Sequence, residues 1–293
     1  MKKALSLILA SMLVAAMAVS ASAVETLSDD VARNFGFGVQ KATTAWDADG
    51  VKSEGEYYDI DYLPEWCVGV CHDASLSDAA QNLDVDVAIS WDDTYLYTWL
   101  SYTESTGHHF DAAEHSGFWD GEIVQLGAAE IDVAVEDAAD RLETGYGMYT
   151  ADGTKATMNW ADGKGTGHCA NNAGVDDFEC FVDGNTITYE IRTPFNAFTS
   201  KTVAEGLQFK LCYVICYDGG AGEYLMWSLG DGVTGGAKDA SLHANVTLKA
   251  APVVEVVEEV VEAPAAPQTF DAGVIAAVVA IVSAAGYAVS KKR

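Results

Sequence analysis

The sequence predicts an all-β fold, an antiparallel β-sandwich of the jelly-roll type, between two distinctive chain ends. Apolar and polar residues alternate over residues 83–91, and an aromatic-rich run follows over residues 95–102. This pattern predicts an antiparallel hairpin in which each strand has one buried face. Helical periodicity is poor elsewhere, and short strand patterns recur between Gly-rich turns. A hairpin is only marginally stable alone, so the other strands must form the rest of a two-layered structure.

The strand patterns after the hairpin are separated by clear turn signals. Asp152-Gly153 and Asp183-Gly184-Asn185 each lie between two strand-like runs, where Gly accepts the positive φ of a tight turn. Before the hairpin, residues 62–72 read as a loop. The predicted strands cover residues 123–126, 130–135, 146–150, 154–160, 178–182, 186–191, 207–217, 224–229 and 244–248.

The two ends of the chain predict export and membrane anchoring. Residues 1–23 combine Lys2 and Lys3, an apolar run and a small-residue site, which is typical of a secretory signal peptide cut after Ala23. The uncharged run 272–289 is just long enough to span a bilayer as a helix, and the basic tail 290–293 stays on the cytoplasmic side. We therefore expect residues 24–249 to form the exported domain.

A stalk and a sorting motif precede the predicted span. Residues 250–267 are rich in Pro, Val and Glu, a composition that favours an extended spacer. Residues 268–293 form the predicted anchor region. Pro267, just before it, and Thr269, at its start, fit the sorting signal of Gram-positive surface proteins, which this arrangement resembles. The resemblance implies a cell-wall transpeptidase as partner and a place on the extracellular face of the membrane or cell wall. Ala266 and Phe270 depart from the motif, where Leu and Gly are usual.

The composition is strongly acidic. The chain of 293 residues has 44 Asp and Glu against 16 Lys and Arg, a formal net charge of −28. Nucleic-acid binding is therefore excluded from the expected functions, because phosphates are normally bound by Lys and Arg. Acidity of this kind fits an extracellular surface with possible cation sites.

Several short motifs follow one another in a characteristic order between residues 42 and 248. An Asp-Gly turn comes first, a strand ending in Trp-Asp-Asp follows, and a Glu-x-x-x-Pro strand comes late. The motifs are Asp49-Gly50 with Glu54 and Tyr57, Trp91-Asp92-Asp93 with Tyr95 and Tyr97, Trp119-Asp120-Gly121-Glu122, Glu190 with Pro194, Tyr217-Asp218, and Trp227.

In this order the motifs resemble the family-nine carbohydrate-binding modules and their relatives with the DOMON-like sandwich. The resemblance implies a β-sandwich that binds sugar ends or polysaccharide, often with structural Ca²⁺ and without catalysis of its own. Relatives in the wider superfamily bind haem instead.

Candidate sugar-binding residues are tryptophans in or beside loops, where binding residues concentrate. Flat aromatic rings stack on the apolar face of a sugar, while polar neighbours take its hydroxyls. Trp66, Trp119 and Trp160 have loop positions, whereas Trp91 and Trp99 lie on predicted strands and are expected in the core.

Two cofactor hypotheses remain open at this point. Asp47, Asp49 and Glu54 place hard oxygen ligands around a glycine turn, as Ca²⁺ prefers. The sequence Cys67-x-x-x-Cys71-His72 is one residue longer than the usual haem c attachment motif, and a disulfide from Cys67 to Cys71 or over a longer range is the alternative. Cys212 and Cys216 lie on one face of a predicted strand, too far apart to bridge one another. The remaining cysteines are Cys169 and Cys180.

No catalytic motif stands out from the acidic background: the sequence has neither a Gly-x-Ser-x-Gly motif nor a phosphate-binding loop. We therefore expect a non-catalytic cell-surface protein that binds carbohydrate by stacking sugars on loop aromatics. The alternatives are an extracytoplasmic haem or redox protein and a structural or adhesive surface protein.

Overall fold

A computed structural model describes most of the chain between residues 35 and 253. The described residues are 23–24, 35–60, 62, 67–71, 83–111, 118, 121–133, 141–166, 175–217, 225–233 and 238–253. The chain divides into two compact units, residues 1–252 and 253–293, and all of the strands belong to the first unit. In the described ranges no helix is long and apolar enough to cross a membrane. The predicted membrane span, most of the signal peptide, the sorting motif at Pro267 and Thr269, and nearly all of the stalk lie outside these ranges.

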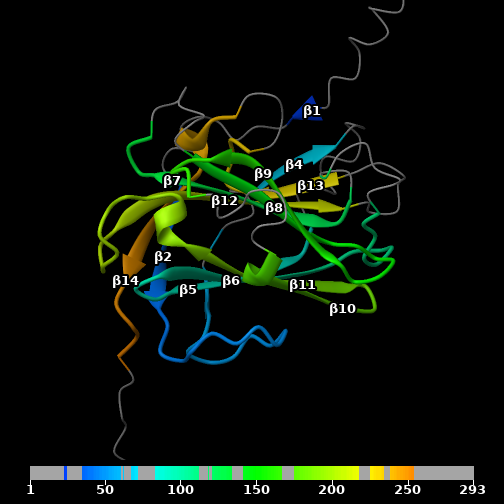
Figure 1. The fold of residues 1–293 in the computed structure, drawn as a ribbon, viewed down its shortest axis with the longest axis horizontal. Coiled ribbons are helices and arrows are strands. Elements are labelled where there is room, and N and C mark those ends of the chain that lie inside the picture. Colours follow the sequence, from blue (N-terminus) through cyan, green and yellow to red (C-terminus); the bar gives the residue numbers. More distant parts are fainter. Residues whose placement is uncertain are drawn as a thin grey trace, which may run out of the picture. The chain divides into compact units, whose positions relative to one another are not determined.

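The first unit is built almost entirely of β-strands, which form one continuous hydrogen-bonded path (Figure 1). The path runs β1-β4-β13-β12-β14-β2-β5-β6-β11-β10, while β3 pairs with β5 and the series β7, β8, β9 continues from β12. The strands are β1 (Ala23–Val24), β2 (Gly36–Lys41), β3 (Tyr58–Asp59), β4 (Cys67–Cys71), β5 (Val85–Trp91), β6 (Tyr95–Thr103), β7 (Ile123–Glu130), β8 (Arg141–Met148), β9 (Lys155–Asp162), β10 (Phe178–Asp183), β11 (Thr186–Pro194), β12 (Gln208–Tyr217), β13 (Leu225–Leu229) and β14 (Ala244–Lys249). Three short 3₁₀ helices are described, η5 (Val175–Asp177), η6 (Phe195–Ala197) and η7 (Ala240–Leu242).

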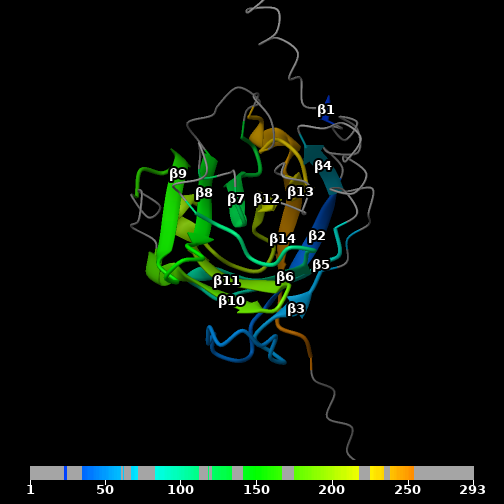
Figure 2. The same cartoon turned by 90° about the vertical axis from the view of Figure 1, so that its right-hand side faces the viewer.

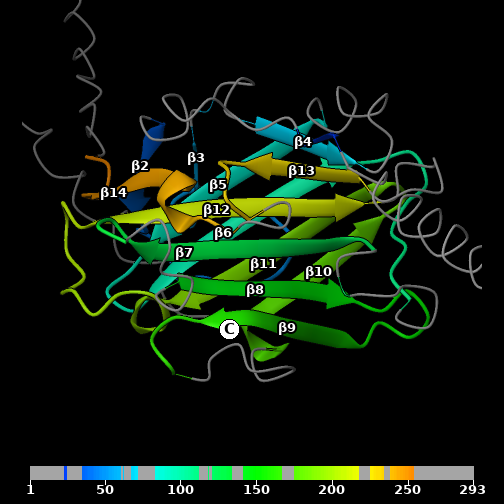
Figure 3. The same ribbon diagram turned by 90° about the horizontal axis from the view of Figure 1, so that it is seen from above.

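The path folds into two layers, as predicted. Figure 2 shows β5, β6, β11 and β10 in the first layer and β4, β13, β12, β7, β8 and β9 in the second, with β2 and β14 joining them at one side. Seen from above, the strands of the two layers cross at an angle (Figure 3). The main core fills the space between the layers, and it includes Leu100 and Ile191 from the first layer and Leu126 and Tyr213 from the second.

The predicted hairpin is confirmed as β5 and β6, paired from Val85↔Tyr102 to Trp91↔Leu96. Asp92 fixes its turn, because one carboxylate oxygen accepts hydrogen bonds of 2.7 Å from the backbone N–H of both Thr94 and Tyr95. The predicted turn at residues 183–185 also joins two strands, β10 and β11. Local alternation and turn chemistry were therefore sufficient to place these elements.

Two predictions about the sheet are wrong in detail. Residues 67–71 form β4 between β1 and β13 rather than a loop, because β13, distant in sequence, supplies a pairing edge for a Val-containing segment. The sandwich is also not wholly antiparallel, since β2 pairs in parallel with both β14 and β5.

The segment 42–57 covers the outer face of the first layer, and Figure 2 shows it beneath β5, β6 and β11. Tyr57 packs there with Ala88, Tyr97 and Trp99, and all four side chains are buried. The hairpin strands are therefore buried on both faces over much of their length, not on one face as predicted. The prediction that Trp91 and Trp99 are core residues is confirmed, with exposed fractions of 2% and 9%.

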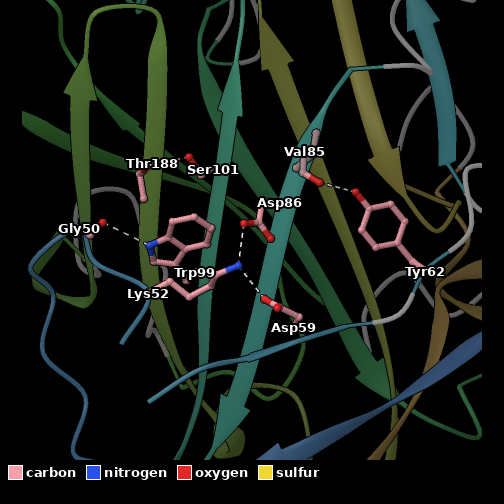
Figure 4. Close-up of polar contacts among 9 residues, drawn as sticks. All are labelled: Gly50, Lys52, Asp59, Tyr62, Val85, Asp86, Trp99, Ser101 and Thr188. Atoms are coloured by element: carbon pink, nitrogen blue, oxygen red, sulfur yellow. Dashed lines mark hydrogen bonds and ion pairs between the residues drawn. The ribbon is translucent and has the colours of Figure 1, made fainter. Parts of the chain in front are cut away.

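Lys52 fastens this segment to the sheet (Figure 4). Its ammonium lies 5.1 Å from the centre of the Trp99 ring and forms ion pairs of 2.7 Å with Asp59 and with Asp86. The Trp99 indole N–H donates to the Gly50 carbonyl at 3.5 Å. Because both ion pairs are partly exposed, each contributes no more than about 1 kcal/mol to stability.

Glu190 of β11 makes the deeper contact with the same segment. Its fully buried carboxylate accepts hydrogen bonds from the Gly50 N–H at 2.9 Å and from the Tyr57 hydroxyl at 3.2 Å. Two of the recognised motifs, Asp-Gly and Glu-x-x-x-Pro, thus meet at one hydrogen-bonded junction. Burial raises the pKa of Glu190 to about 7, and burial also raises the pKa of the neighbouring Glu56.

The raised pKa of Glu190 predicts that this residue contributes most to stability in acid. An acid whose pKa is higher in the folded state binds its proton more tightly there. Its contribution to the free energy of unfolding is therefore complete below the unfolded-state pKa of 4.5, and it is lost as the pH rises through about 7. In chemical denaturation, the difference in the free energy of unfolding between the wild type and Glu190→Gln should fall between these pH values by up to about 1.4 kcal/mol per pH unit. The wild-type profile alone does not test the assignment, because the lowered pKa of buried His243 acts in the opposite direction over the same interval in both proteins. A difference between the two profiles that stays constant or rises with pH would contradict the assignment.

Candidate functional site

The outer face of the second layer is buried, although a sandwich normally leaves such a face in water. Along β12, Leu211, Tyr213 and Ile215 face the main core, whereas Cys212 and Val214 belong to a separate buried cluster on the other face. Strands β7 and β8 are likewise buried along almost their whole length. This second buried face holds the candidate site.

An aromatic wall, defined as Phe118 and Trp160, stands over one part of this face. Their rings are 6.2 Å apart and meet edge to face, and both are half-buried. Trp160 is the extra residue of a β-bulge, because Glu143 pairs with Ala161 while Thr144 pairs with Asn159. Bulges redirect side chains and are frequent next to binding sites.

The absence of a side chain at Gly145 of β8 leaves room for the aromatic wall to pack against the sheet. A side chain at this position would put a Cβ 2.8 Å from the Trp160 ring and 3.0 Å from the Phe118 ring. The indole therefore lies directly against the backbone of β8. Glycine inside a strand often marks such a close approach.

An ion cluster, defined as Arg141, Glu143 and Lys238, lies beside the aromatic wall. The Arg141 guanidinium approaches one Glu143 carboxylate oxygen to 2.6 Å, and the Lys238 ammonium approaches the other to 2.8 Å. The side chain of Glu143 is fully buried, and its ion pairs with the two cations offset the cost of desolvating its charge. The Lys238 side chain remains 29% exposed, so it is the member of the cluster that reaches solvent.

The aromatic wall and the ion cluster are close neighbours. Glu143 and Gly145 are two residues apart on one strand, so their side-chain positions lie about 7 Å apart on the same face. The aromatic wall and the ion cluster therefore lie side by side on the outer face of β8. Ligand sites commonly combine aromatic walls with a few placed polar groups in this way.

A buried histidine also packs on the same face. His243 lies over Gly127 of β7, where a Cβ would come within 2.7 Å of Nε2. The Nδ1–H donates to the Asp231 carbonyl at 2.7 Å, which leaves Nε2 as an acceptor with no hydrogen-bond partner among the described residues. Burial lowers the pKa of His243 to about 4, so the ring is neutral at neutral pH. Lys210 borders it and donates to the Ser241 carbonyl at 2.9 Å.

Of the three tryptophans predicted to bind sugar, the structure places Trp160 at this site. Trp66 and Trp119 lie outside the described residues, although Phe118, next to Trp119 in sequence, belongs to the aromatic wall. The prediction that Cys212 and Cys216 share one face of a strand is confirmed, since both lie on β12 within the second buried cluster.

The predicted calcium ligands do not converge. Among the described residues, no three His, Cys, Asp or Glu side chains gather closely enough to hold a metal ion, and this includes Asp47, Asp49 and Glu54. The Asp49 carboxylate instead accepts from the Val51 N–H at 2.9 Å, as in an ordinary turn. Calcium binding at this turn therefore remains a prediction without a preformed ligand set.

The predicted Cys67–Cys71 disulfide is not formed. Both residues lie on β4, where residues four apart are about 13 Å from one another, whereas bridged Cα atoms are closer than about 7 Å. Cys67 is a thiol buried in the main core. The Cys71 side chain and His72 lie outside the described residues, so haem attachment at this motif gains no support.

Sequence reasoning missed the ion cluster and His243. Arg141 and Glu143 alternate with Leu142 on β8, a weak strand signal, and Lys238 is far away in sequence. The most useful local signal was the pair Gly145 and Gly147 inside a strand pattern, since strand glycines mark close approach by other groups.

We expect the ion cluster to stabilise the fold as well as the site. Glu143→Ala should lower the free energy of unfolding by about 3 kcal/mol, because it leaves two cations without their buried counter-ion. In the matched control, Glu179→Ala removes a partly exposed partner of Lys155 and should cost less than about 1 kcal/mol. Equal losses in denaturant titrations of the two variants would contradict the assigned role of Glu143.

Comparison with known proteins identifies the fold. No protein-family model matches the sequence, and no curated protein matches it significantly. A family 9 carbohydrate-binding module from Caldicellulosiruptor kristjanssonii in complex with cellotriose is 14% identical, with a TM-score of 0.51, over 75% of this chain and 97% of that one. The same kind of module from this organism in complex with glucose is 15% identical, with a TM-score of 0.50, over 73% of this chain and 97% of that one. The chain thus has the fold of family 9 carbohydrate-binding modules.

Proposed function

We propose that this protein binds carbohydrate, without catalysis, at the outer face of its second layer. The observation that carries the proposal is the half-buried Trp160, which a β-bulge sets against Gly145 beside the ion cluster. An aromatic ring offers a flat apolar surface to a sugar ring, while the polar groups beside it can bond to hydroxyls.

Each part of the site has a separate role in this proposal. Trp160 provides the stacking surface, and Lys238 donates hydrogen bonds to sugar hydroxyls from its partly exposed ammonium. Arg141 and Glu143 are positioning residues, because they hold Lys238 in place through the 2.8 Å ion pair. A fixed polar group loses little side-chain freedom when the ligand binds, which strengthens binding.

The fold likeness supports this choice of ligand class. Two solved structures with this fold are carbohydrate-binding modules, one in complex with cellotriose and the other with glucose. Their identity with this chain is low, so the site is assigned from the residues of this chain and not from theirs. We further propose that the exported domain is displayed at the cell surface by residues 250–293, through the predicted stalk, membrane span and sorting motif.

Substitution of Trp160 tests the proposal most simply. In isothermal titration of the full chain with cellotriose, Trp160→Ala should weaken binding at this site by at least about tenfold, since loss of a stacking ring removes most of the apolar contact. Trp160→Phe should retain part of the affinity because it retains a ring.

The matched control is Tyr58→Ala. Tyr58 is a half-buried aromatic residue of β3 in the first layer, remote in topology from β8 and β9. This variant should bind cellotriose as the wild type does. Unchanged binding by Trp160→Ala, with folding confirmed by circular dichroism, would refute the assignment of the site.

A further inference from the structure

A surface depression of about 390 Å³ lies at one end of the first layer. Its walls come from the β5–β6 turn, from η6 at the end of β11, and from the segment that follows η6. The residues that line it include two aromatic residues, the half-buried Tyr95 and the buried Phe195, together with polar and charged residues: Asp93, Thr94, Asn196, Thr199, Ser200 and Lys201. None of these residues belongs to the aromatic wall or the ion cluster.

The ring of Tyr95 is held in position. It lies 6.0 Å from the Tyr97 ring on one side, and the Arg192 guanidinium lies 5.3 Å from its centre. Arg192 is itself bonded to Asp177 at 2.7 Å. Tyr95 is half-buried and is one of the residues that line the depression.

The opposite rim is also fixed. The backbone N–H and the hydroxyl of Ser200 both donate to one carboxylate oxygen of Glu130 at 2.9 Å, and Lys201 pairs with Asp132 at 3.1 Å. These hydrogen bonds lower the pKa of Glu130 to about 2, so the anchoring carboxylate stays charged in ordinary buffers. These contacts order the rim before a ligand binds, so binding does not carry the entropy cost of ordering it.

We infer that this depression is a second saccharide-binding site, which takes one neutral sugar unit. Tyr95 supplies the ring against which the sugar lies, and the exposed amide of Asn196 supplies both a donor and an acceptor for its hydroxyls. The inference takes only the class of ligand from the proposed function, because the residues of the depression differ from those of the first site and lie at the first layer. Two sites on one chain would also strengthen attachment to a polymer through multivalent binding.

The test is isothermal titration of the full chain with cellotriose, analysed for the number of sites. The wild type should show two sites. Asn196→Ala and Tyr95→Ala should each weaken one of them by about tenfold, while Tyr95→Phe should leave both, because it keeps the ring. Trp160→Ala should weaken the other site only.

The outcomes separate this inference from the proposed function. A single site lost in Trp160→Ala and unchanged in Asn196→Ala would overturn the second site and leave the first intact. A single site lost in Asn196→Ala and Tyr95→Ala but kept in Trp160→Ala would support the depression and refute the site at the aromatic wall. Binding of a uronic acid trimer at the depression, without binding of cellotriose there, would overturn the assignment of a neutral sugar.

Discussion

The burial of the second layer on both of its faces is the constraint on which the rest of this structure depends. Residues 209–217 of β12 are buried without interruption, so alternate side chains serve two different interiors. One interior is the apolar core between the layers. The other contains a charged pair that must be neutralised where it lies, since neither Arg141 nor Glu143 has access to bulk water. Lys238 pairs with the other carboxylate oxygen of Glu143 and connects the buried pair to the surface.

Two of the recognised motifs, at Asp49-Gly50 and at Glu190 with Pro194, hold the fold together and lie outside the proposed site. Glu190 joins the Glu-x-x-x-Pro strand to the Asp-Gly turn through the Gly50 N–H, and Asp92 organises the central hairpin turn. Both carboxylates accept hydrogen bonds from backbone N–H groups and therefore stabilise the fold. This explains why the order of weak motifs was a good guide to the fold. The residues proposed to contact the ligand, Trp160 and Lys238, lie outside the motifs, where the sequence carries no comparable pattern.

The sequence therefore predicted the elements that local chemistry determines. The hairpin of β5 and β6 follows from alternation and an Asp-containing turn, and Trp160 was selected because of its loop-side position. β4 could not be recognised, because its strand character depends on pairing with β13, more than 150 residues later in the chain. The contact of Glu143 with Lys238 likewise joins positions remote in sequence, and no local spacing encodes it. The bulge that turns Trp160 toward Gly145 is a property of the paired strands and not of either one alone.

The most direct test of the central claim is an experimental structure of the chain in complex with cellotriose. The account predicts a sugar ring lying against the Trp160 indole, with a hydroxyl within hydrogen-bonding distance of the Lys238 ammonium. A complex in which no sugar atom touches Trp160 or Lys238, although cellotriose is bound elsewhere on the chain, would contradict it.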